Sequence, residues 1–180
     1  MFFSVNHAFS ALTGRRAADD FDWFEACFPA VEVLNGHLLA HNNHLAARLA
    51  SHARRIAVGG SDAHALCSAG SVWTEVRGAR NKAEFLEGLR EGRARACGES
   101  GSYWKLTLDV LAVGCEMFRE TPATLLLAPF LVGIPALTFI NHLVERRFAR
   151  KWGQAWARMR GLSGGAAIPS IPAATGEARA

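Results

Sequence analysis

The chain has 180 residues, of which half are hydrophobic and a fifth are charged. This balance excludes a disordered chain, and the length fits one ordinary domain or a domain fragment with an extension. The formal net charge of +4 is mild. Lysine occurs only at positions 82, 105 and 151, so the basic excess is almost entirely arginine. The position of these arginines decides between a nucleic acid and an anionic membrane surface as partner.

The first third of the chain predicts two short strands. Residues 1–6 are apolar enough for a strand, and an aromatic-rich segment follows over 21–28. Residues 30–34 predict a second strand, which the turn Asn35-Gly36 closes.

Helices and strands then alternate. Apolar residues at helical spacing predict a helix over 38–55, and the short apolar run 56–60 is typical of a parallel strand buried on both faces. A further strand is expected over 71–76. Asn81 has the sequence context of a helix N-cap, and an apolar stripe predicts a helix over 103–119. The order indicates an α/β domain with crossover helices over residues 1–120.

The chain then becomes strongly apolar. Residues 122–144 contain no Asp, Glu, Lys or Arg, and their length approaches the roughly 20 residues that span a bilayer. We therefore expect a hydrophobic, membrane-spanning helix over 121–144. Pro129 and Pro135 would kink this helix, which membrane helices tolerate better than soluble ones do.

A basic amphipathic segment over 145–161 follows directly. Phe148, Trp152 and Trp156 recur at every fourth position among six basic residues, as in an aromatic and basic girdle at a membrane surface. This placement makes a membrane the expected partner of 122–160 and a nucleic acid an unlikely one. The positive-inside tendency puts the C-terminal tail in the cytoplasm, and a wholly cytoplasmic protein is the alternative. Residues 162–180 are expected to be a disordered tail.

One short motif, GSDAH, carries candidate chemistry. Asp62 and His64 follow an apolar strand and stand two residues apart, so their side chains can converge on one ion. The glycines before them let the backbone turn at a strand's carboxyl end, where α/β barrels keep their active sites. Carboxylate and imidazole together suit zinc, manganese or iron(II). A structural or capping role for this pair is an equally open interpretation.

The motifs NHAF (6–9), AVEVLNG (30–36), GGSDAH (59–64) and FLEGLREGRARACG (85–98) occur in this order. Their succession resembles the C-terminal half of the PHP family, the polymerase and histidinol phosphatase metal-dependent phosphoesterases. The likeness covers about residues 1 to 100. It implies the C-terminal part of a distorted (β/α)7 barrel, with His7, Asp62 and His64 among the ligands of a divalent metal cluster (Zn, Mn or Fe) that activates water.

The resemblance also implies what is missing. The family's opening His-x-His pair, its next histidine and its bridging glutamate all precede the element that contains His7. We therefore expect a truncated PHP-type hydrolase that is inactive by itself, or a non-catalytic, membrane-tethered remnant or accessory module.

The expected substrate is a small phosphorylated compound or a related ester, with Asn35 and Arg93 as candidate substrate-binding residues. No individual catalytic residue can be assigned. His41 and His44, three residues apart on a helix, could also bind zinc, although a solvated or capping role is the favoured interpretation.

Overall fold

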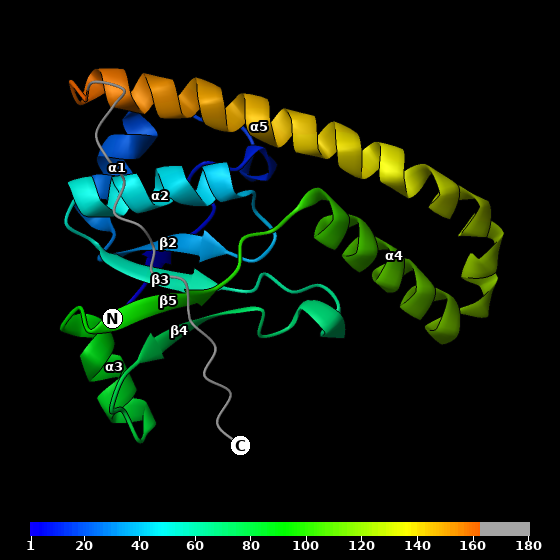
Figure 1. The fold of residues 1–180 in the computed structure, drawn as a ribbon, viewed down its shortest axis with the longest axis horizontal. Helices are drawn as coiled ribbons and strands as arrows, with labels where there is room; N and C mark the ends of the chain where they lie inside the picture. Colours follow the sequence, from blue (N-terminus) through cyan, green and yellow to red (C-terminus); the bar gives the residue numbers. More distant parts are fainter. Residues whose placement is uncertain (163–180) are drawn as a thin grey trace.

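The structure, a computed structural model, describes residues 1–162 and contains a small parallel sheet. Strands β1 (Ser4–Val5), β2 (Ala30–Asn35) and β3 (Ile56–Gly60) pair in the order β1-β2-β3, all parallel (Figure 1). Every residue of β2 is buried, as expected for a central strand covered on both faces. The carboxyl ends of the three strands therefore meet at one edge.

An antiparallel ribbon of β4 (Val72–Val76) and β5 (Ala94–Gly98) lies beside β3. The Thr74 hydroxyl accepts a 2.9 Å hydrogen bond from the Gly59 amide and donates a 2.8 Å bond to the Gly59 carbonyl. A Cβ atom on Gly59 would lie 3.1 Å from Ala96 Cβ, so the glycine permits this close approach. In the part of the chain that the structure describes, the five strands form a mixed α/β arrangement and no closed barrel.

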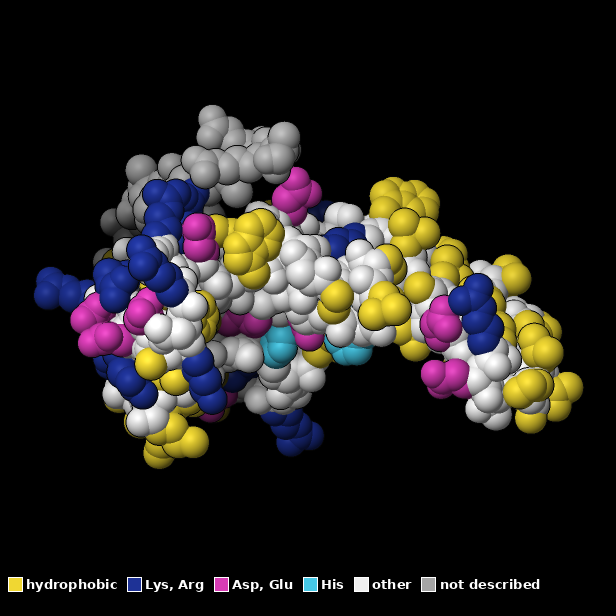
Figure 2. Space-filling model, turned by 90° about the horizontal axis from the view of Figure 1, so that it is seen from below, with side chains coloured by type: hydrophobic (Ala, Val, Ile, Leu, Met, Phe, Trp, Pro, Cys, Tyr) yellow, Lys and Arg dark blue, Asp and Glu magenta, His cyan; other side chains and the backbone are white. Residues whose placement is uncertain are grey.

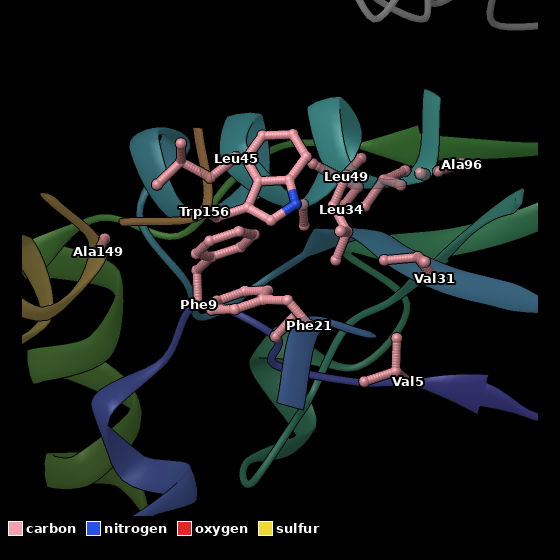
Figure 3. Close-up of a cluster of buried hydrophobic side chains, with 14 of the residues drawn as sticks. Val5, Phe9, Phe21, Val31, Leu34, Leu45, Leu49, Ala96, Ala149 and Trp156 are labelled. Carbon is pink, nitrogen blue, oxygen red and sulfur yellow. The ribbon is translucent and has the colours of Figure 1, made fainter. Parts of the chain in front are cut away.

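Two helices and the end of a third cover the parallel sheet. Helix α2 (Ala40–His52) packs on β2, and the last turns of α5 (Ile134–Met159) lie across α2 and α1 (Asp19–Cys27). The aromatic segment predicted over 21–28 is thus largely a helix. Its Phe21 joins a core that includes the fully buried residues Phe9, Leu49 and Trp156 (Figure 3).

The end of α5 is fastened to α1. The Trp156 indole donates a 2.8 Å hydrogen bond to Glu25 Oε1, and the Arg160 guanidinium pairs with Glu25 and Asp22. We expected Trp156 in a girdle at a membrane surface, but the structure buries it in the core. An aromatic stripe at every fourth residue fits either environment, so the pattern alone did not decide between them.

The middle of α5 is held by a buried carboxylate. Glu145 accepts hydrogen bonds from the Ser10 hydroxyl (2.9 Å), the Ala11 amide (3.0 Å) and the Asn42 side chain (2.8 Å). These bonds join α5 to both the N-terminal segment and α2. The basic segment 145–161 is therefore part of the globular fold.

Helix α3 (Lys82–Arg90) follows the predicted signals. The Asn81 side chain caps it by accepting a 3.0 Å hydrogen bond from the Glu84 amide. Gly92 adopts a φ of 74° just beyond the helix end, a conformation that glycine takes without strain. Two short 3₁₀ turns, Ala11–Thr13 and Leu66–Ser68, complete the loops at the carboxyl edge of the sheet.

Helix α4 (Tyr103–Glu120), a 3₁₀ stretch η3 (Pro122–Gly133) and the first half of α5 form a hairpin that projects from the globular part (Figures 1 and 2). The predicted single helix over 121–144 thus changes from 3₁₀ to α geometry at Ile134, beside Pro135. Continuous helical structure from Pro122 to Met159 is long and apolar enough to cross a membrane, by length and composition.

The apolar residues of the hairpin are mostly uncovered. Only 6% of its most apolar window is buried, and side chains such as Leu126, Phe130 and Val132 are 84%, 73% and 85% exposed. The core helix of a soluble protein would also satisfy the length and composition criteria. The disordered tail expected over 162–180 falls, from residue 163 on, outside the described residues.

Candidate functional site

The carboxyl edge of the parallel sheet collects the residues that the sequence singled out. His7 lies two residues beyond β1, Asp62 two residues beyond β3, and Asn35 is the last residue of β2 between them. His7 Nδ1 is 4.0 Å from Asp62 Oδ2. The structure therefore brings two of the three predicted ligand residues, His7 and Asp62, together at one sheet edge.

Both residues have an unusual backbone conformation. His7 and Asp62 adopt φ values of 54° and 51°, in the left-handed region that residues other than glycine seldom occupy. Such conformations cost free energy and concentrate at functional sites. Here they turn the chain shortly after β1 and β3, the two strands that flank β2, where the two side chains approach each other.

Asn35 lies fully buried beneath this pair, and its amide orientation is determined by the backbone. Its Oδ1 accepts hydrogen bonds from the amides of His37 (2.8 Å) and Leu38 (3.0 Å). Because an amide nitrogen cannot accept these bonds, the side chain cannot be flipped. The Nδ2 group must therefore point to the opposite side.

On that side, Nδ2 of Asn35 faces three acceptors. It lies 3.2 Å from His7 Nδ1, 3.2 Å from Glu32 Oε2 and 3.3 Å from Asp62 Oδ2. An NH₂ group has two hydrogens, so it cannot fully satisfy all three acceptors at once. The cluster therefore retains acceptor capacity directed at a donor or a cation.

Glu32 is the member of this cluster whose role the sequence left open, between a site residue and a strand residue that faces a helix. It accepts a 3.2 Å hydrogen bond from the His7 amide, and its side chain is 7% exposed. Burial raises the pKa of Glu32, although nearby His7 and the bond from Asn35 oppose the shift. Because both faces of β2 are buried, the strand pattern could not indicate which face Glu32 occupies.

His64 is placed differently from the other two predicted ligands. Its Nδ1 lies 2.8 Å from the Asp62 carbonyl oxygen, and its ring stacks on His37 with centroids 5.4 Å apart. Its imidazole is exposed. Of the predicted trio, His7 and Asp62 are thus the pair whose side chains approach within 4.0 Å.

A second acid–imidazole pair comes from outside the predicted motifs. His37 Nε2 contacts Asp109 Oδ2, and the Cys67 thiol donates a 3.3 Å hydrogen bond to Asp109 Oδ1. Burial alone would raise the pKa of Asp109, but hydrogen bonds from His37, Ser68 and Cys67 outweigh it and lower that pKa. The sequence signal for this pair was weak, because Asp109 is one of two acids, with Glu116, in the apolar helix 103–119.

These groups open into a cavity of about 460 Å³ between the sheet edge and the hairpin. Figure 2 shows histidine side chains exposed between the globular part and the hairpin. The strand-end wall includes His7, His37, Asp62 and His64. The hairpin contributes Tyr103, Leu106, Asp109, Val110, Val113, Asn141, His142 and Glu145.

The two candidate substrate-binding residues do not line this cavity. Asn35 lies behind the wall, where it contacts His7 and Asp62. Arg93 precedes β5, and its guanidinium pairs with Glu91 at 2.7 Å. The structure therefore gives Arg93 a surface ion pair and places it outside the cavity.

The types of ligand present suit a divalent metal, but there are too few of them for a complete site within the described residues. Imidazole and carboxylate are suitable ligands for zinc, manganese or iron. Within residues 1–162, however, no group of three or more His, Cys, Asp or Glu side chains is arranged to hold a metal ion. The described residues thus provide a ligand pair rather than a complete metal site.

His41 and His44 on α2 have surroundings that disfavour a cation. Burial lowers the pKa of both, and nearby positive groups lower it further: Arg48 near His44, and Arg146 and Arg150 near His41. This environment argues against zinc binding by the pair, the alternative to the expected solvated or capping role.

Many α/β proteins bind ligands at the carboxyl ends of their parallel strands. This domain, with imidazole and carboxylate groups at that edge, belongs to this class. Residues 40–94, which include Asp62 and His64, match the family model described as PHP-associated. This confirms the resemblance to the C-terminal region of PHP proteins over that segment. No curated protein and no solved structure matches the chain.

Proposed function

We propose that this chain carries the C-terminal half of a PHP-type metal-dependent hydrolase of phosphoesters or related esters. One observation carries the proposal: His7 Nδ1 and Asp62 Oδ2 lie 4.0 Å apart at the carboxyl edge of the sheet, and Asp62 belongs to the PHP-associated segment. In this proposal His7, Asp62 and His64 contribute ligands to a Zn, Mn or Fe site. The parallel strands then form part of a distorted (β/α)7 barrel.

The chain's own residues hold and orient the ligand pair. The side chain of Asn35 is oriented by hydrogen bonds from two backbone amides, and its NH₂ group contacts His7 and Asp62. Glu32 accepts a hydrogen bond from the His7 amide and so orients the backbone there. When bound, divalent ions supply an activated water and positive charge for the phosphoryl oxygens. Because these residues do not form a complete metal site by themselves, the proposal requires further ligands from groups beyond the described residues.

Metal binding tests this assignment. We expect the purified chain to bind a single Mn²⁺ or Zn²⁺ weakly, as measured by calorimetry or by the electron paramagnetic resonance of free Mn²⁺. His7→Ala and Asp62→Ala should abolish this binding. Asp19→Ala is the matched control, because Asp19 is an exposed carboxylate on α1. Equal metal affinity in wild type and Asp62→Ala would contradict the proposed site.

Hydrolysis of an aryl phosphate with Mn²⁺ or Zn²⁺ separates ligand contribution from catalysis. We expect negligible turnover by the 180-residue chain, because a metal-activated water needs more ligands than the described residues provide. Robust turnover that disappears in Asp62→Ala would mean that another part of the assembly, such as a second subunit, completes the site.

A membrane-tethered, non-catalytic module is the second candidate, and the uncovered hairpin favours it. Residues 122–144 are uncharged, and Arg146, Arg147 and Arg150 follow on the exposed side of α5. Such a sequence suits hydrocarbon next to an anionic surface. In either function, we propose that the hairpin attaches the chain to a membrane.

The packing of α5 constrains how that attachment is arranged. Trp156 lies against Phe9, with ring centroids 6.2 Å apart, so the end of α5 is on the same side of a membrane as the domain. The apolar segment 122–144 of the hairpin would therefore enter the membrane from one face without crossing it. With the C-terminal tail in the cytoplasm, the PHP-related domain is cytoplasmic too.

A further inference from the structure

The cavity beside the candidate site has one largely apolar wall. Leu106, Val110 and Val113 of α4 stand four and three residues apart, so they share one helix face, and all three line the cavity. Leu12, Leu38 and Leu39 extend the apolar lining from the domain side. Neither lysine nor arginine is among the residues that line it within the described chain.

The polar groups of the cavity divide into occupied and available ones. Glu145 already accepts three hydrogen bonds, and Asp109 is engaged by His37 and Cys67. His7 and Asp62, by contrast, have partly unsatisfied acceptors, as the single amide group of Asn35 serves both. The available acceptors at the strand ends thus lie opposite the apolar wall, and on the hairpin side His142 adds an Nδ1 that is unpaired within residues 1–162.

The apolar wall is accessible to a ligand. Val113 is 41% exposed and Leu12 is 76% exposed, so both retain apolar surface that a ligand could cover. The volume of about 460 Å³ lies within the range of roughly 300–1,000 Å³ that small-molecule sites occupy. A small polar phosphate alone would leave most of this lining in contact with water.

We propose that the substrate is an ester with an apolar alkyl or aryl group. The apolar group packs along Leu106, Val110 and Val113, while the ester group faces His7 and Asp62. This inference rests on the proposed function, to which it adds the class of substrate. The apolar wall of the cavity matches the alkyl or aryl group of such a molecule, and the polar strand ends match its ester group.

Calorimetric titration with hexyl phosphate and methyl phosphate, each with Mn²⁺, tests the proposal. We expect hexyl phosphate to bind the purified chain at least tenfold more tightly, because each buried methylene favours binding several-fold. Val110→Trp should fill the wall and weaken hexyl phosphate binding at least tenfold. Val132→Trp is the control, because Val132 is 85% exposed on η3 and does not line the cavity.

A second variant serves if the tryptophan substitution prevents folding, as judged by circular dichroism. Val110→Asp introduces a smaller side chain than tryptophan and places a charge in the apolar wall. It should also weaken hexyl phosphate binding at least tenfold. Equal affinity for the two phosphates would overturn the proposal. So would hexyl phosphate binding that neither Val110 variant changes, or that Val132→Trp weakens equally.

Titration with 1-hexanol distinguishes failure of the substrate class from failure of the proposed function. Hexanol requires no metal, so its binding should be sensitive to Val110→Trp and insensitive to Asp62→Ala. Hexanol binding of this kind, combined with no Mn²⁺ binding, would reject the metal-dependent function and retain the apolar site. Hexanol binding that Val110→Trp leaves unchanged would reject the apolar site itself.

Discussion

The side-chain amide of Asn35 lies 3.3 Å from the carboxylate of Asp62, across the carboxyl ends of two neighbouring parallel strands. Asn35 is fully buried and its Oδ1 is occupied by two backbone amides. The amide therefore couples the turn after β2 to the candidate ligand pair. Changes at Asn35 should affect both the stability of the fold and the geometry of the site.

Asn35→Ala should destabilise the protein by about 2–4 kcal/mol, because it leaves the buried amides of His37 and Leu38 without an acceptor. Urea unfolding followed by circular dichroism measures this effect. Asn6→Ala is the control, since Asn6 is exposed and should change the free energy of unfolding by less than about 0.5 kcal/mol. Equal effects of the two substitutions would argue against an anchoring role for Asn35.

The protonation of Glu32 should make stability depend on pH. Burial raises the pKa of Glu32 above its ordinary value of 4.5, so the folded protein binds this proton more tightly than the unfolded chain does. Its contribution to stability is therefore complete below pH 4.5 and is lost as the pH rises through the folded-state pKa. Glu32→Gln should remove this loss and flatten the pH profile above 4.5.

Free energies of unfolding measured by urea titration between pH 4 and pH 8 check this expectation for the metal-free protein. The control is Glu99→Gln, which changes a carboxylate that does not belong to the cluster. A Glu32→Gln profile with the same slope as wild type would mean that Glu32 titrates normally in the folded state.

The parallel strands could be predicted because β2 and β3 are short apolar runs that a doubly covered sheet requires. Strand β5 was not predicted, since Ala94–Gly98 carries Arg95 and follows a helix stop at Gly92 without a strong apolar pattern. Residues 94–98 form a strand because they pair with β4. Such pairing between distant segments is not encoded in the local pattern.

Within the site, His7 and Asp62 could be predicted because each follows an apolar strand, and parallel strand ends share one edge. The contact between His37 and Asp109 could not, because 72 residues separate them and only the docking of α4 brings them together. The stacking of His64 on His37 joins the loops that follow the neighbouring strands β2 and β3. Local spacing placed His64 beside Asp62, while tertiary packing determined where its ring points.

Trp156 should be essential to the packing of α5 on the domain. Trp156→Ala should cost about 3–5 kcal/mol, as expected for removing a fully buried indole. Trp156→Phe should cost less, because it keeps apolar bulk and loses the hydrogen bond to Glu25. Trp104→Ala is the control, as Trp104 is 67% exposed. Guanidinium unfolding of the three variants measures these costs, and a small effect of Trp156→Ala would contradict the packing.

The hairpin should hold the chain on membranes through the apolar residues of η3. Leu126 and Val132 are 84% and 85% exposed, and a lysine within hydrocarbon costs about 2.5–3.5 kcal/mol. The double substitution Leu126→Lys and Val132→Lys should therefore weaken membrane partitioning roughly 10⁴- to 10⁵-fold. Membranes from cells that express the full chain can be washed with alkaline carbonate, which should leave wild type in the pellet and release the double variant.

Leu66→Lys should stay with the membrane, because Leu66 is 95% exposed on a loop of the domain, far in sequence from the hairpin. Release of wild type by the same wash would mean that η3 is covered by protein rather than lipid.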